Sequence, residues 1–238
     1  MMALGLKLIL AHIIGDFFLQ PENWVMDKEK KKLKSVWLYV HVAIHIALMF
    51  LFVWDLSYAT LIIAIGLSHL IIDGLKLTLQ RKKTKRLFFF IDQLLHLTVL
   101  LALSYTFYHG TSNFTLTMRP YMLLLVICVA FLTTPTSIIM KTIFSKWNIS
   151  KLTKDNESLK DAGKYIGILE RLLVFIFIVE GQWEAVGFLV TAKSVFRFGD
   201  LTASKERKLT EYILIGTLIS FGIAILTSLI YLNLRAYV

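Results

Sequence analysis

Residues 36–54 read VWLYVHVAIHIALMFLFVW, and this stretch contains no Asp, Glu, Lys or Arg. Its 19 residues approach the length of about 20 that an apolar helix needs to cross the hydrocarbon of a bilayer. Two histidines, His41 and His45, lie within it four residues apart, which places both imidazoles on one face of a helix. The stretch therefore predicts a membrane-spanning helix that carries a polar site on one side.

The rest of the chain has the same apolar character. Of its 238 residues 57% are hydrophobic, the mean hydropathy is +0.68, and there are three prolines. We predict an all-α, polytopic integral membrane bundle that forms a single membrane domain, with a His/Asp-rich half over 1–110 and a second helical half over 120–238. Hydropathy predicts eight spans, at residues 2–20, 36–54, 58–80, 87–108, 120–143, 165–181, 184–200 and 211–234. The seventh contains Lys193 and Arg197 and could be re-entrant instead.

The formal charge of +10 comes from lysines and arginines in alternate connections between the apolar stretches. Clusters follow the first, third, fifth and seventh stretches, whereas the intervening connections are almost free of positive charge. This pattern is the positive-inside pattern of membrane proteins, and it does not indicate nucleic-acid binding. It predicts cytoplasmic basic loops with both termini outside. The single Cys128 excludes an internal disulfide framework.

Three further apolar segments contain a histidine and an aspartate at the same spacing of four. These pairs are His12 with Asp16, His69 with Asp73, and Asp92 with His96. Five of the six histidines therefore have a histidine or aspartate neighbour at this spacing, although these two residue types make up only 14 of 238 residues. The predicted topology places all four pairs in the cytoplasmic half of the bilayer, where unpaired carboxylates are costly.

Imidazole and carboxylate groups at one depth are suited to binding a divalent metal. The eight predicted donors could bind two ions with about four ligands each. Alternatively, some of them bind one ion and the others hold those ligands in place by hydrogen bonds. Because no thiolate is available, we expect zinc first, with manganese or iron as alternatives. The other interpretation of each pair is a hydrogen-bonded polar contact between helices without a metal. The eight are His12, Asp16, His41, His45, His69, Asp73, Asp92 and His96.

The remaining membrane-embedded charges suggest a second role on the same side. Lys76, Arg171, Lys193 and Arg197 could form an anion pocket for the head group of a lipid. Alternatively, the cations extend to the interface and Glu170 pairs with Arg171. Glu170 is also a spare carboxylate for a general base, a role that Asp16 or Asp92 could fill if either is not a metal ligand.

Several stretches connect the chain to known families. They read AHIIGDFFLQ, SHLIIDGLK and FIDQLLH in the first half, and IGILERLL, GFLVTAKSVFRFGD and EYILIGTLISF in the second. By these stretches the chain resembles a bacterial membrane family called domain of unknown function 3307, which implies a place in the cytoplasmic membrane but no activity. The first four predicted helices also resemble the YdjM-like predicted membrane-bound metal-dependent hydrolases.

We therefore expect a metal-dependent hydrolase that acts on a lipid or lipid-linked, phosphate-containing substrate at the cytoplasmic leaflet. A divalent-metal transporter is the second hypothesis. It is disfavoured because the outer halves of spans two, three and four contain no ionisable residue for an ion to pass. A scaffold or sensor with a structural metal is the third. Membrane lipids are the only partners that the sequence indicates.

Overall fold

The computed structural model describes residues 2–108, 119–147, 162–198 and 204–238, and within them the backbone is helical with no strand. The predicted all-α class is confirmed. The chain divides into two compact units, Met1–Ile127 with Val238, and Cys128–Tyr237. Unit 1 contains α1 (Met2–Ile13), the π-helical turn η1 (Ile14–Phe18), α2 (Glu22–Lys31), η2 (Lys32–Lys34), α3 (Val36–Val53), η3 (Leu56–Tyr58), α4 (Ala59–Leu79) and α5 (Lys85–Thr106). The boundary falls within α6 (Pro120–Leu132), and unit 2 continues with α7 (Thr134–Phe144), α8 (Ala162–Val179), α9 (Trp183–Phe198) and α10 (Ser204–Leu234).

The number of membrane spans differs from the prediction. By length and composition, five helical segments of the described chain could cross a membrane, or six if the bent pair formed by Met2–Phe18 and Glu22–Lys34 counts as one span. The prediction of eight is therefore wrong. Helices form at all the predicted places, but α9 has only 16 residues and α8 contains three charged side chains. These helices are compatible with a multi-pass membrane protein.

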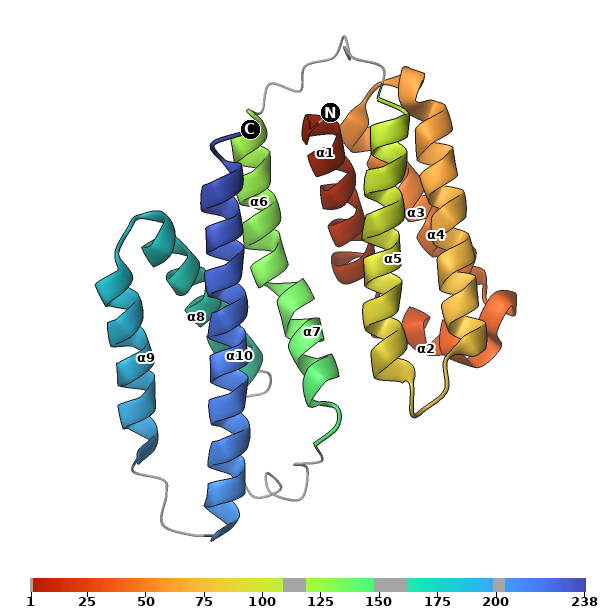
Figure 1. Cartoon of the computed structure of the whole chain (residues 1–238). Coiled ribbons are helices and arrows are strands. Elements are labelled where there is room, and N and C mark those ends of the chain that lie inside the picture. The colour runs from red at the N-terminus through yellow and green to blue at the C-terminus, as the bar shows by residue number, and fades with distance from the viewer. Residues whose placement is uncertain (1, 109–118, 148–161, 199–203) are drawn as a thin grey trace. The chain divides into compact units, whose positions relative to one another are not determined.

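In unit 1, α1, α3, α4 and α5 pack side by side as a four-helix bundle (Figure 1). On all four helices the residues of the apolar core lie toward the same end of the bundle, relative to the pair of His or Asp residues. They precede His12 on α1 and His69 on α4, and they follow His45 on α3 and His96 on α5. The core consists of Leu4, Leu8, Ala11, Met49, Val53, Tyr58, Leu61, Ile62, Ile65 and Leu100. It fills the end of the bundle opposite α2.

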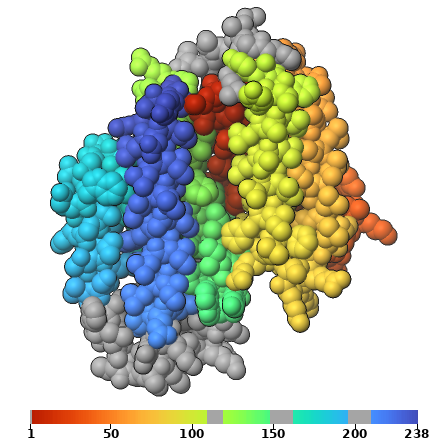
Figure 2. Space-filling view, in the orientation of Figure 1, coloured from red at the N-terminus to blue at the C-terminus, as the bar shows by residue number. Residues whose placement is uncertain are grey.

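The outward faces of the bundle remain apolar. On α5, which is coloured yellow in the space-filling view of Figure 2, Leu87, Leu94, Leu101 and Tyr105 are all exposed. Their spacing of seven and four residues aligns them along one face of the helix. A row of exposed leucines beside a buried polar interior is the arrangement expected of a helix that faces lipid.

The bundle begins with a sharp turn between α1 and α2. The π-helical turn η1 follows α1, and the chain then bends by 84° between the segments Met2–Phe18 and Glu22–Lys34, near Pro21. α2 is tied to the start of α3 by Asp27, which accepts hydrogen bonds from Ser35 Oγ at 2.7 Å and from Lys31 Nζ at 2.6 Å. The Lys31 and Ser35 hydrogen bonds hold the pKa of Asp27 below its usual value, so this carboxylate stays charged at neutral pH. α2 is therefore fixed across the end of the bundle.

In unit 2, a single buried arginine supports a broken helix. α6 and α7 are interrupted at Thr133, with Pro135 in the first turn of α7, so carbonyl groups near the break lack their helical partners. Arg171 on α8 donates to the Leu132 and Thr133 carbonyl oxygens at 2.7 and 3.3 Å. Its remaining bonds go to the hydroxyls of Ser137 and Ser220, at 2.9 and 3.2 Å.

We predict that Arg171→Met strongly destabilises unit 2. Methionine fills much of the same space but leaves the buried Leu132 carbonyl without its donor, at a cost of about 1–3 kcal/mol, and removes the bonds that Arg171 makes to Ser137 and Ser220. Thermal unfolding in detergent should show a clearly lower Tm for this variant. Lys164→Met removes an exposed positive charge from the same helix and should leave the Tm nearly unchanged. Equal Tm values for the two variants would contradict this role of Arg171.

Candidate metal centre

The centre is built around Asp16, which η1 turns into the bundle. Its Oδ1 atom lies 3.0 Å from His45 Nε2, 3.1 Å from His41 Nε2 and 3.6 Å from His69 Nε2. Its Oδ2 atom lies 3.7 Å from His12 Nε2. One carboxylate is thus surrounded by four imidazoles from α1, α3 and α4. π-Helical turns within α-helices occur frequently at functional sites, and here the turn directs the carboxylate inward.

The close approach of η1 to α3 requires a glycine. A Cβ atom on Gly15 would lie 2.5 Å from His45 Cε1 and 2.9 Å from His45 Cδ2, well inside van der Waals contact. Gly15 is buried, and the His45 ring packs directly against its backbone. Only the absence of a side chain at this position lets His45 reach Asp16.

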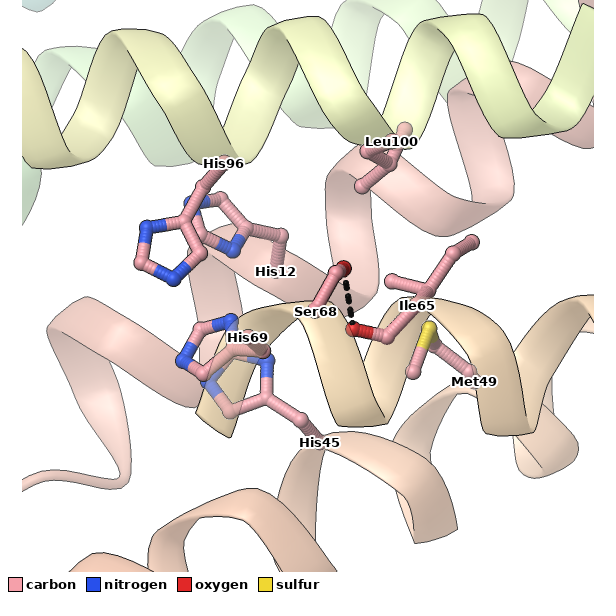
Figure 3. A pocket seen from close by; sticks show the side chains of 8 residues that line it. All are labelled: His12, His45, Met49, Ile65, Ser68, His69, His96 and Leu100. Carbon is pink, nitrogen blue, oxygen red and sulfur yellow. Dashed lines mark hydrogen bonds between the residues drawn. The ribbon is translucent and has the colours of Figure 1, made fainter. Parts of the chain in front are cut away.

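His96 and His69 join the cluster from α5 and α4. Their ring centroids are 3.9 Å apart, and the His45 and His69 centroids are 4.1 Å apart. Figure 3 shows His12, His45, His69 and His96 gathered at one end of a small cavity, with apolar side chains at the other. The cavity measures about 10 Å³, which is room for about one water-sized group. It is lined by His12, His45, Met49, Ile65, Ser68, His69, His96 and Leu100.

Several buried polar atoms of the cluster have no hydrogen-bond partner within the described chain. They are His12 Nε2, His41 Nδ1, Asp92 Oδ1 and His96 Nε2. His96 Nδ1 lies 2.9 Å from the Asp92 carbonyl oxygen, which can only accept, so Nδ1 donates this hydrogen bond and Nε2 is the ring nitrogen left to bind an ion. A histidine fixed in this way by a backbone carbonyl is typical of a metal ligand.

The donor set fits a cation better than a network of hydrogen bonds alone. His41 Nε2 and His69 Nε2 are 3.2 Å apart while both face Asp16, so protons on both nitrogens would repel each other. A divalent ion needs unprotonated nitrogens and a charged carboxylate, which is what this arrangement offers. Among the described residues, three groups have donor atoms that all lie within 4.8 Å of one another: His12, Asp16, His45 and His69; His41, His69 and Asp73; and Asp73, Asp92 and His96.

Two lysines enter the centre as well. Lys28 Nζ lies 3.0 Å from Asp73 Oδ2, and the Lys28 side chain is buried. Lys76 Nζ lies 2.6 Å from Asp92 Oδ2. Sequence reasoning missed Lys28, which belongs to a run of lysines between two apolar stretches. No local signal distinguishes it from its neighbours, because Asp73 is 45 positions away.

Two glutamines complete the centre. Gln20 Nε2 lies 2.9 Å from His41 Nε2, and Gln93 Nε2 donates to Asp16 Oδ2 at 2.7 Å. Sequence reasoning missed both. The signal was present for Gln20, which follows Asp16 by the same spacing of four that defined the histidine pairs.

The eight predicted ligands therefore come together in unit 1, with Lys76 beside them, whereas the other predicted residues lie in unit 2. There Glu170 accepts a hydrogen bond of 2.5 Å from Lys193 Nζ, and Arg171 binds the α6–α7 break. The side chain of Arg197 lies outside the described residues. The roles of Glu170, Arg171, Lys193 and Arg197 in catalysis or head-group binding remain predictions.

Comparison with known proteins identifies a family but no activity. Residues 4–125 match the family model described as "Protein of unknown function (DUF3307)", which is about half of the chain and includes all eight candidate ligands. No curated protein and no solved structure matches the chain. The chain belongs to the DUF3307 family.

Proposed function

We propose that this protein is a membrane-embedded, metal-dependent hydrolase acting on a lipid or lipid-linked, phosphate-containing substrate. The observation that carries the proposal is the convergence of five imidazoles and Asp16 from four helices on one buried point. Burying so many ionisable groups among apolar helices is costly unless a cation and a function compensate. Zinc is the ion that such nitrogen and oxygen donors favour, with manganese or iron as alternatives.

The position of the centre supports an enzyme over a carrier. The apolar core occupies the rest of the bundle in unit 1, and the described residues of that core offer an ion no polar path to the other end. The basic connections lie at the same end as the centre, because Lys85 Nζ contacts Glu29 Oε1 at 2.5 Å and Lys32 Nζ contacts the Leu77 carbonyl at 2.5 Å. By the positive-inside rule, this end would face the cytoplasmic leaflet.

We assign separate roles to the residues of the centre. His12, Asp16, His45 and His69 would hold the ion, while His41 and Gln20 would keep Asp16 and its neighbours in place. When bound, the ion would lower the pKa of a bound water and polarise the phosphoryl or acyl group. Asp92 is the best-placed general base, because Lys76 occupies Oδ2 while Oδ1 has no hydrogen-bond partner and can accept a proton.

The test is an activity panel with the purified protein in lipid nanodiscs. Lipid phosphates, lipid diphosphates and carboxylic esters are supplied with zinc, manganese or iron, and product release is measured. We expect hydrolysis of one phosphate class that stops when a chelator removes the metal. Metal uptake into proteoliposomes without any hydrolysis would instead establish the carrier. A folded protein that binds metal but does neither would indicate a structural ion.

Two carboxylate variants identify the general base. We predict that Asp92→Asn retains the metal but lowers kcat by about 100-fold or more, as expected when a positioned proton acceptor is lost. Glu170→Gln should retain most of its activity, because Glu170 belongs to unit 2, whereas all the candidate ligands belong to unit 1. The two variants are compared by initial rates at saturating metal. The reverse ranking would move the general base to Glu170.

A further inference from the structure

We propose that the centre takes up a single divalent ion, because the ammonium groups of Lys28 and Lys76 occupy the place of a second one. This inference rests on the metal centre of the proposed function and concerns the number of ions that it holds. Two-metal sites in helical bundles use two sets of carboxylate and histidine ligands, and this bundle contains two donor groups that share no residue. The second set is Asp73, Asp92 and His96, whose donor atoms lie within 4.8 Å of one another.

The two lysines bind the carboxylates that a second ion would need. Lys28 Nζ contacts Asp73 Oδ2 at 3.0 Å, and Lys76 Nζ contacts Asp92 Oδ2 at 2.6 Å. The side chains of Asp73 and Asp92 are only 7% and 2% exposed, so both carboxylates are shielded from water. A buried ion pair whose members are held in place cannot easily release one partner, because the remaining charge would be left uncompensated.

Both ammonium groups are positioned by elements that the fold fixes. Lys28 projects from α2, which the Asp27–Ser35 hydrogen bond ties across the end of the bundle. Lys76 lies one turn beyond Asp73 on α4 and reaches Asp92 on α5. In contrast, no hydrogen bond or ion pair joins the first donor set, His12, Asp16, His45 and His69, to a lysine in the described chain. The ammonium groups therefore block one set and leave the other open.

The charge balance of the centre also favours one metal ion over two. With neutral histidines, the three aspartates and two lysines leave one negative charge in the centre. One divalent ion changes this to one positive charge, which a bound hydroxide would cancel. A second divalent ion would raise it to three positive charges in a medium of low dielectric constant, which is strongly unfavourable. Without the lysines, two divalent ions would again leave a single positive charge.

The experiment measures the metal content of the full-length protein after it is loaded with excess zinc and passed through a desalting column. We expect about one ion per chain in the parent protein and about two in the double variant Lys28→Met/Lys76→Met, in which the second donor set is free. Lys30→Met/Lys34→Met removes two exposed lysines from the same connection and should stay at one. Elemental analysis gives each count relative to protein.

The outcomes separate this inference from the proposed function. Two ions in the parent, or one ion in a folded Lys28→Met/Lys76→Met variant, would overturn the inference while leaving the metal centre intact. A folded parent without metal would overturn the proposed function itself. If the lysine variant does not fold, Asp73→Asn/Asp92→Asn decides: it should still bind one ion, and loss of that ion would show that these carboxylates hold it.

Discussion

Replacing His69 with alanine should abolish stoichiometric metal binding by the purified protein. His69 belongs to two of the three donor groups, and its Nε2 atom lies 3.6 Å from Asp16 Oδ1 and 3.2 Å from His41 Nε2. Its ring also packs between those of His45 and His96. Loss of a residue that only supports a ligand lowers metal affinity by about 10–100-fold. Loss of a ligand at the middle of the centre should therefore lower the affinity by more than ~100-fold. Competition with a chelating dye measures the change.

A neighbouring residue provides the control for this variant. Ser68 lines the same cavity but donates its hydroxyl to the Ile65 carbonyl at 2.8 Å, so it is already satisfied within its own helix. Ser68→Ala should therefore bind metal with parental affinity. If His69→Ala retains the ion while remaining folded, or if Ser68→Ala loses it to the same extent, the centre is not organised around His69.

The centre was predictable from sequence to the extent that it depends on helical spacing. Residues four apart share a helix face, and charged groups in apolar helices must face inward, so the four pairs could be expected to meet. Lys28 and Gln93 could not be found in this way, because their partners Asp73 and Asp16 belong to other helices. The π-helical turn at Ile14–Phe18 could not be predicted either, since it lies where Gly15 packs against His45 of another helix, a contact that local propensity does not contain.

The fold shows the same division between local and tertiary causes. Apolar length alone predicts α3, α4, α5 and α10, each of which is long enough to span. The overcount of spans arose where charge or length was marginal, as in α8, which contains Lys164, Glu170 and Arg171. Hydropathy treats Arg171 as a charge to be avoided. In the structure it donates to the Leu132 and Thr133 carbonyls at the break between α6 and α7, which a profile of single residues does not reveal.

Gly15→Ala should disrupt both stability and metal binding through one added methyl group. In an ordinary helix this change stabilises by roughly 0.5–1 kcal/mol, because alanine loses less conformational entropy than glycine on folding. At Gly15 the new Cβ would instead lie 2.5 Å from His45 Cε1, and the ring would have to move away from Asp16. Overpacking of this kind costs about 1–3 kcal/mol, and displacement of His45 removes one of the four donors of the first set.

The measurement compares four proteins by Tm in detergent and by zinc affinity. Gly5→Ala, on the preceding helix α1, is the control, because its Cβ would meet only Leu101 Cδ2 at an ordinary 4.0 Å, and it should match or exceed the parent in both readouts. The double variant Gly15→Ala/His45→Ala removes the His45 ring, with which the added methyl group would clash. We expect the double variant to recover Tm relative to Gly15→Ala but not zinc binding, because relief of a steric contact restores packing without restoring a ligand. If zinc binding also returned in the double variant, His45 could not be a ligand. If Gly15→Ala behaved like Gly5→Ala, the position of His45 would not depend on the glycine.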